Sequence, residues 1–255
     1  MIVYPNAKLN LGLSILGKRS DGFHDIETLY IPYKAKTDEL EIDRSERFET
    51  RIGGTWSADE DITVKAYKML SQAHRMPPVK IRLIKGIPVG SGLGGGSSDA
   101  VAALKMLNEM FSLNLSEEKL LEFASRLGSD CPFFVHNRPM LGTGRGDVLT
   151  PYEIDLSDYD IKVLVPEGIR INTREAYEGV PEHEGMPLLE ALAHPVEQWK
   201  DVLVNDFERS IFLKYPRLAK LKQDFYDKGA VYASMTGSGS AIFGLFRKEG
   251  LFGKD

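Results

Sequence analysis

The clearest pattern of apolar and polar positions lies between Val79 and Met110. Val79, Ile81 and Leu83 alternate with cationic residues, and this period of two predicts a half-buried strand. From Ala100 to about Met110 the apolar residues recur at helical spacing with neither glycine nor proline, which predicts a helix. The chain between these segments is rich in glycine, so the predicted order is strand, glycine loop and helix.

Helical spacing also marks segments on both sides of this unit. Apolar residues from about Asp61 to Ala73 predict one helix, and Ser116, followed by two glutamates, opens another that runs to Gly128. After Pro151 the pattern changes to short strands and several helices, which predicts an α+β second half. The elements expected there are a strand at 161–165, a helix from Asn172 or Thr173, an exposed loop at 181–187, helices at 190–193, 199–209 and 217–228, and a strand pair at 236–240 and 241–246.

The composition suits two modest globular domains. The chain has 255 residues, of which 42% are hydrophobic, and we place the two domains at residues 1–151 and 152–255. A net charge of −5 argues against a nucleic-acid partner. Cys131 is the only cysteine and no leader or membrane span is visible, so we expect a cytoplasmic protein without a membrane partner.

The glycine loop has the chemistry of a polyphosphate-binding site. Glycine lets the backbone approach a ligand closely and turn its N–H groups inward, and the start of a helix adds a partial positive charge. Ser97, Ser98 or Asp99 would cap that helix, and Asp99 is better explained as a cap than as a metal ligand. The predicted nucleotide-binding residues are Pro88, Val89, Gly90, Ser91, Gly92, Leu93, Gly94, Gly95, Gly96, Ser97 and Ser98.

Three alternative roles for the glycine loop fit its flanks less well. Gly90, Gly92 and Gly95 satisfy the dinucleotide fingerprint G-x-G-x-x-G, but that fold needs a second parallel strand after the helix, and another helix is predicted there. A Walker A loop is excluded because no lysine followed by serine or threonine closes the motif. A flexible linker shares the composition, but a linker does not need a patterned strand before it and a helix after it.

Three motifs together resemble the GHMP kinase superfamily. They are a P-x-A-K-x-N segment at Pro5–Asn10, the glycine loop at Pro88–Ser98 and a late T-G-S-G segment at Thr236–Gly239, in the order that the family has. Two further blocks, Lys18–His24 and Gly128–Phe134, resemble the members that act on a cytidine-diphosphate-linked polyol. The resemblance covers nearly the whole chain.

The resemblance implies a two-domain α+β fold, with an S5-like N-terminal domain and a ferredoxin-like C-terminal domain. It also implies that ATP phosphorylates a hydroxyl group of a small-molecule polyol linked to cytidine diphosphate. Asp130 would accept the proton of that hydroxyl, and Lys8 beside it would hold the carboxylate ionised. The simpler alternatives are a turn residue at a helix end for Asp130 and a solvated strand lysine for Lys8.

Recognition of a cytosine ring needs a stacking face and hydrogen bonds to the edge of the base. Phe23 and His24 can supply both from one turn, although relatives commonly carry tyrosine where this chain has Phe23. The alternative for each aromatic residue is a packing role in the core. By resemblance, the remaining substrate-binding residues are Asn10, Tyr30, Thr173 and Tyr177.

Several features allow two interpretations. Mg²⁺ is expected to arrive bound to the nucleotide, with Ser97 or Ser98 able to place a hydroxyl on it, and no residue is assigned as a dedicated metal ligand. Arg145 brings a guanidinium to a phosphate or belongs to a plain turn. The segment Thr236–Gly239 is expected to pack against the phosphate loop, with a simple hairpin turn as its alternative.

Rival functions remain open at this point. Another GHMP kinase, acting on mevalonate or homoserine, would share the loop but lack the block around Phe23 and His24. A non-catalytic nucleotide-binding module of the S5-like type would have little reason to keep both Lys8 and Asp130.

Relatives usually add a helix and a strand where only Arg247–Asp255 follow the last apolar strand, which predicts a trimmed C-terminal domain or an open sheet edge. The pattern defines no oligomeric state.

Overall fold

The computed structural model describes residues 1–53 and 60–248. The chain divides into two compact units, and both the first long strand and the glycine loop contribute residues to each. Unit 1 comprises Met1–Lys8, Pro32–Val89 and Gly94–Arg138, and unit 2 comprises Leu9–Ile31, Gly90–Leu93 and Pro139–Asp255. The division at residue 151 assumed two continuous segments, and it stays a prediction.

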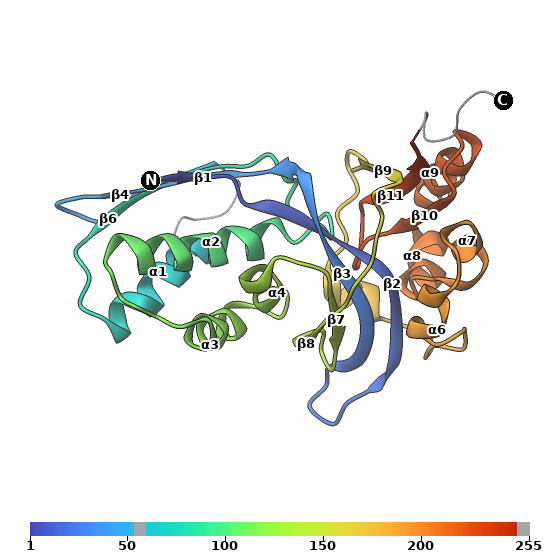
Figure 1. Ribbon diagram of the computed structural model, residues 1–255, viewed down its shortest axis with the longest axis horizontal. Coiled ribbons are helices and arrows are strands. Elements are labelled where there is room, and N and C mark those ends of the chain that lie inside the picture. The colour runs from blue at the N-terminus through green and yellow to red at the C-terminus, as the bar shows by residue number, and fades with distance from the viewer. Residues whose placement is uncertain (54–59, 249–255) are drawn as a thin grey trace. The chain divides into compact units, whose positions relative to one another are not determined.

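Unit 1 consists of a four-stranded sheet with the order β1-β4-β6-β5 and helices on one of its faces (Figure 1). Strand β4 pairs antiparallel with β1 and β6, whereas β5 runs parallel to β6. The elements are β1 (Ile2–Val3), β4 (Glu39–Arg44), β5 (Glu49–Ile52), α1 (Ile62–Ala73), β6 (Val79–Ile84), α2 (Gly95–Met110), α3 (Glu117–Leu127) and α4 (Cys131–His136). The predicted strand, glycine loop and helix are confirmed as β6, the loop and α2.

Unit 2 contains two sheets, with the orders β2-β3-β7-β8 and β10-β11-β9. Its core joins Leu13 and Ile26 of the first sheet to Phe207 and Met235. The strands are β2 (Asn6–Lys18), β3 (His24–Thr37), β7 (Met140–Thr143), β8 (Val148–Pro151), β9 (Tyr159–Leu164), β10 (Tyr232–Met235) and β11 (Ile242–Arg247). The helices are α5 (Thr173–Tyr177), α6 (Leu188–Ala193), the 3-10 turn η2 (Val196–Gln198), α7 (Trp199–Val202), α8 (Phe207–Lys214) and α9 (Pro216–Asp227).

The structure corrects three expectations about element boundaries. Helix α2 is capped by Gly94 in the left-handed conformation, so the predicted cap at Ser97, Ser98 or Asp99 is wrong. The helix expected over 199–209 is interrupted, because Leu13 bonds through its N–H to the Val204 carbonyl (2.9 Å) and through its carbonyl to the Asp206 N–H (2.9 Å). The stretch 236–240 is a turn between β10 and β11, not a strand. The residues 249–255, on which the expected trimming of the C-terminus depends, lie outside the described residues.

Candidate functional site

The glycine loop requires glycine at three alternate positions. Gly90, Gly92 and Gly94 have φ angles of +71°, +78° and +71°, in the left-handed region that side chains disfavour. The first intrahelical bond of α2 runs from the Ser98 N–H to the Gly94 carbonyl (3.0 Å), and no side chain caps the helix. The N–H groups that precede this bond therefore present the positive end of a 16-residue helix, which favours an anion.

The first half of the loop is packed against the turn that follows β10, as expected from the sequence. The Ala241 N–H donates to the Ser91 carbonyl (3.0 Å). A Cβ atom at Gly92 would lie within 3.1 Å of the Thr236 carbonyl oxygen and of the Gly239 backbone. Only a residue without a side chain permits this backbone approach, so the turn fixes the conformation of the loop at Gly92.

Lys8 and Asp130 are brought together by the fold of unit 1. The Lys8 Nζ lies 3.4 Å from the Asp130 Oδ2, and the two side chains are 3% and 31% exposed. Asp130 directly precedes α4, but its carboxylate makes no capping bond to that helix. The carboxylate thus points to a buried ammonium while remaining open to solvent on one side, and Lys8 is not the solvated strand lysine of the simpler alternative.

The same region contains the start of α2. A Cβ atom at Gly94 would lie 2.9 Å from the Lys8 Cγ and 3.1 Å from the Phe134 ring, so the loop, β2 and α4 converge at this glycine. A helix N-terminus, an ammonium and an accessible carboxylate thereby occupy one corner of unit 1. This set can bind phosphate groups and accept a proton from a nearby hydroxyl.

Cys131 follows Asp130 and is fully buried. Burial raises the pKa of its thiol to about 12, against the opposing effect of a hydrogen bond with Ser97. Because the thiolate is the reactive form, this cysteine is a small packing residue and not a nucleophile.

Three of the residues predicted to bind substrate, Phe23, His24 and Tyr177, carry aromatic rings in unit 2. The His24 ring stacks on Tyr177 with centroids 4.5 Å apart and 10° between the ring planes. Phe23 is 55% exposed, and the Arg145 guanidinium carbon lies 5.0 Å from the centroid of its ring. Thr173 begins the short helix that ends at Tyr177, and its side chain faces solvent.

Two other predicted substrate-binding residues are buried. Asn10 is 2% exposed, and its amide donates to the Thr28 Oγ1 (3.0 Å) and accepts from the Thr236 Oγ1 (3.2 Å). Tyr30 is also 2% exposed and packs beneath Gly142 and a turn of the β7–β8 hairpin. Both environments are those of structural residues, and direct contact with a substrate stays a prediction for each.

Sequence reasoning missed a buried ionic cluster beside α2. The Lys85 ammonium donates to Asp38 and to the Asp99 Oδ2 (2.5 Å), and Asp38 also accepts from the N–H groups of Gly86 (2.6 Å) and Ile87 (2.7 Å). Among the described residues, no partner lies within hydrogen-bond distance of the buried Asp99 Oδ1. The register was the available signal, because pairing of Glu39 with Ile84 places Asp38 opposite Lys85.

Because of this cluster, we expect the unfolding free energy of the protein to fall as the pH rises. Burial raises the pKa of Asp99 from 3.8 to about 8; the Lys85 ammonium opposes the rise and the Asp38 carboxylate adds to it. Between these values the unfolded chain has released a proton that the folded chain retains, so this group lowers the unfolding free energy by up to about 1.4 kcal/mol per pH unit. The Asp99→Asn variant lacks this titrating group. As the pH is raised from 5 to 8, its unfolding free energy should therefore increase relative to that of the parent protein, as measured by urea unfolding. Parallel pH profiles for the two proteins would contradict the prediction.

Two kinds of feature are absent from residues 1–53 and 60–248. No group of three or more His, Cys, Asp or Glu side chains in these segments is arranged to hold a metal ion. Likewise, none of the helices in them has the length and apolar character that crossing a membrane requires.

Comparison with known proteins gives a consistent result. Residues 61–138 match the family model of the GHMP kinases N terminal domain, and residues 188–251 match that of the GHMP kinases C terminal domain. The 4-diphosphocytidyl-2-C-methyl-D-erythritol kinase of Bacteroides thetaiotaomicron is 44% identical over 98% of this chain and 93% of its own length. The kinase of that name from Porphyromonas gingivalis is 47% identical with the same coverage.

Solved structures agree. A crystal structure of 4-(cytidine 5'-diphospho)-2C-methyl-D-erythritol kinase superposes with a TM-score of 0.82 at 31% identity, covering 96% of this chain and 90% of the other. The mevalonate kinase of Methanococcus jannaschii superposes with a TM-score of 0.73 at 13% identity, covering 97% of this chain and 90% of the other. At that identity the second match supports the fold alone.

Proposed function

We propose that this chain, which belongs to the GHMP kinase family, transfers the terminal phosphoryl group of ATP to the 2-hydroxyl group of 4-diphosphocytidyl-2-C-methyl-D-erythritol. The reaction is a step of the non-mevalonate route to isoprenoid precursors. One observation carries the proposal: the Lys8–Asp130 pair, 3.4 Å apart, lies beside the N-terminus of the helix that follows the glycine loop. High identity to kinases of this name over nearly the full chain supports the same acceptor.

The residues divide the chemistry between binding and proton transfer. The N–H groups of the loop and of the start of α2 hold the phosphates of ATP, and Mg²⁺ bound to the nucleotide neutralises part of their charge. The 2-hydroxyl oxygen attacks the γ-phosphorus as the bond to the ADP oxygen breaks, and Asp130 takes the hydroxyl proton. The Lys8 ammonium, 3.4 Å from the Asp130 carboxylate, stabilises negative charge on the attacking oxygen.

The aromatic residues Phe23, His24 and Tyr177 of unit 2 recognise the base. Phe23 offers an exposed ring for stacking, and stacking of a base on an aromatic side chain contributes about 1–3 kcal/mol. His24 supplies ring nitrogens for the polar edge of cytosine while its face rests on Tyr177. These residues separate this kinase from members of the family whose acceptor carries no base.

We propose a cytoplasmic location and nucleotide-bound Mg²⁺ on chemical grounds. The one cysteine is buried and free, which suits a reducing compartment. Mg²⁺ keeps several waters and is commonly held through substrate phosphates, so the hydroxyl of Ser97 or Ser98 at the start of α2 is sufficient as a protein ligand.

A comparison of phosphoryl acceptors tests the function. Release of ADP is measured with the purified protein, ATP and Mg²⁺, using the cytidine-diphosphate-linked substrate, mevalonate or homoserine. We expect kcat/KM for the first to exceed the other two by at least about 100-fold, because a site built around a base leaves its polar groups unpaired with smaller acceptors. Equal or better turnover of mevalonate or homoserine would overturn the acceptor, and no turnover of any of them would overturn the activity.

A further inference from the structure

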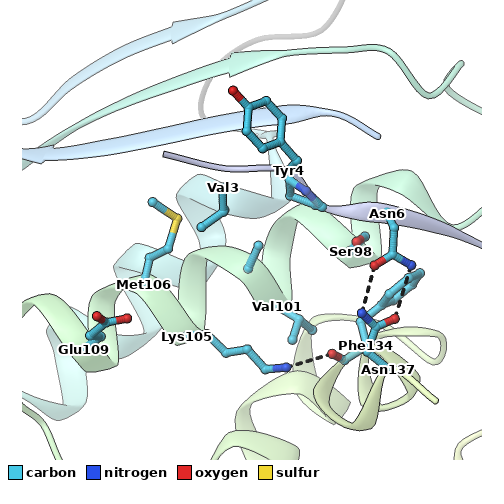
Figure 2. A pocket seen from close by; sticks show the side chains of 12 residues that line it. Val3, Tyr4, Asn6, Ser98, Val101, Lys105, Met106, Glu109, Phe134 and Asn137 are labelled. Carbon is cyan, nitrogen blue, oxygen red and sulfur yellow. Dashed lines mark hydrogen bonds between the residues drawn. The ribbon is translucent and has the colours of Figure 1, made fainter. Parts of the chain in front are cut away.

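Helix α4 contacts strand β2 at both of its ends. At its start, Asp130 meets Lys8 of β2. At its end, Asn137 meets Asn6 of the same strand (Figure 2). Asn6 and Lys8 are two positions apart, so their side chains project from the same face of the strand. Asp130 and Asn137 flank a helix of only six residues, which places the two contacts about 10 Å apart along its axis.

The contact between the two asparagines is reciprocal. The Asn6 amide donates to the Asn137 Oδ1 (3.2 Å), and the Asn137 amide donates to the Asn6 Oδ1 (2.8 Å). Asn6 is 8% exposed and also donates to the Ala7 carbonyl (2.7 Å). Two hydrogen bonds between the same pair of planar groups fix both separation and orientation, and their burial makes an unpaired amide unfavourable.

The backbone at this end of α4 is fixed as well. Asn137 ends the helix in the left-handed conformation, with φ 49° and ψ 43°. The Lys105 ammonium donates to the carbonyls of Phe134 (3.0 Å) and Val135 (2.8 Å), which lie in the last turn. Figure 2 shows Lys105 reaching α4 from helix α2, and Asn6 facing Asn137. All three residues line one pocket of unit 1.

We infer that Asn6 and Asn137 are positioning residues that hold the Asp130 carboxylate 3.4 Å from the Lys8 ammonium, the separation at which the pair acts on the acceptor hydroxyl. The inference rests on the proposed function, in which Asp130 accepts the proton. Lys105 ties the last turn of α4 to α2, whereas the two asparagines tie the helix to β2, the strand that carries Lys8. Loss of the asparagine contact therefore lets this six-residue helix, and Asp130 with it, shift against β2. A displacement of about 1 Å between reacting groups can lower a rate by about 100-fold.

Asn137→Gly is the decisive variant, because glycine accepts the left-handed backbone and only the amide is lost. We expect kcat with the cytidine-diphosphate-linked substrate to fall by about 10- to 100-fold while KM for ATP is unchanged. Asn114→Gly is the matched control, since Asn114 is also left-handed (φ 53°) and, within the described part of the chain, its amide bonds only to the nearby Ser112 carbonyl (3.0 Å). Asn6→Asp retains an acceptor for the Asn137 amide but loses the donor, and an intermediate loss is expected.

The Asp130→Asn background separates positioning from general destabilisation. If Asn137 acts through Asp130, Asn137→Gly lowers kcat in the parent protein but produces no further loss in Asp130→Asn. Each protein is assayed at least about 10 °C below its thermal midpoint, and Asn6→Asp provides the same comparison if Asn137→Gly does not fold. An unchanged kcat in Asn137→Gly, or an equal loss in both backgrounds, would overturn the inference. A parent protein that does not turn over this substrate would instead overturn the proposed function.

Discussion

Replacement of Asp130 by asparagine should lower kcat by about 10²- to 10⁴-fold while KM for ATP stays within about twofold. Asparagine keeps the shape and a hydrogen-bond acceptor but cannot take the proton of the attacking hydroxyl. In the proposed function the glycine loop holds the nucleotide, and this change alters no residue of that loop. Steady-state kinetics at saturating ATP, with the cytidine-diphosphate-linked acceptor varied, measures both constants.

Stability must be followed in the same experiment, because Lys8 is 3% exposed and Asp130 is its carboxylate partner. Loss of that charge leaves a buried ammonium less well compensated, so the thermal midpoint should also fall. Asp43→Asn is a suitable control: Asp43 pairs with the terminal ammonium of Met1 at 3.0 Å and is 54% exposed, so activity should persist. Near-wild-type turnover by folded Asp130→Asn would show that another group is the base.

The start of β2 illustrates what sequence pattern can and cannot predict. Asn6, Lys8 and Asn10 alternate with Ala7 and Leu9, which is the pattern of a strand with one polar face toward water. All three polar residues are nevertheless 8% exposed or less. Pattern predicts the strand and the face, but only the tertiary structure reveals that helix α4 and the Thr236 hydroxyl bond to side chains on that face.

The pairing of Lys8 with Asp130 was predicted through family resemblance rather than from spacing. The residues are far apart in the sequence, and nothing local to either residue specifies the other. What the sequence did contain was an aspartate directly before an apolar run, a setting in which a carboxylate needs a partner. For the missed cluster of Asp38, Lys85 and Asp99 the signal was different. There, the antiparallel register of β4 and β6 places Asp38 opposite Lys85.

The predicted helix boundaries were wrong where tertiary contacts compete with local helix propensity. The residues before Ala100 are small and glycine-rich, which disfavours a helix, yet α2 begins at Gly95 because its first turn is packed against neighbours such as Ile87. The interruption after Val202 has a similar cause, since that segment bridges Leu13 of β2. The substrate roles of Asn10 and Tyr30 stay predictions. A residue's place in a family motif does not specify whether its side chain is exposed, and both of these side chains are buried.

Two positions of the glycine loop share a backbone conformation but differ in the space around a side chain. Gly90 and Gly92 have nearly equal φ angles of +71° and +78°. Among the described residues, a Cβ atom at Gly90 would meet nothing within 4 Å, whereas one at Gly92 would collide with the backbone of Thr236 and Gly239. Alanine at Gly90 therefore measures the conformational strain, and alanine at Gly92 measures the same strain together with the collision.

Gly92→Ala should reduce the unfolding free energy by the roughly 1–2 kcal/mol expected for an alanine in the left-handed region, plus about 1–3 kcal/mol for overpacking. Gly90→Ala should lose only the first amount. Because the collision separates the loop from the turn after β10 and redirects its N–H groups, KM for ATP should rise at least about tenfold more in Gly92→Ala than in Gly90→Ala. Urea unfolding and initial-rate kinetics on both variants supply the numbers. Equal losses at the two positions would mean that the turn after β10 does not hold the loop in the shape proposed to bind phosphate, and that the left-handed glycine conformation alone does so.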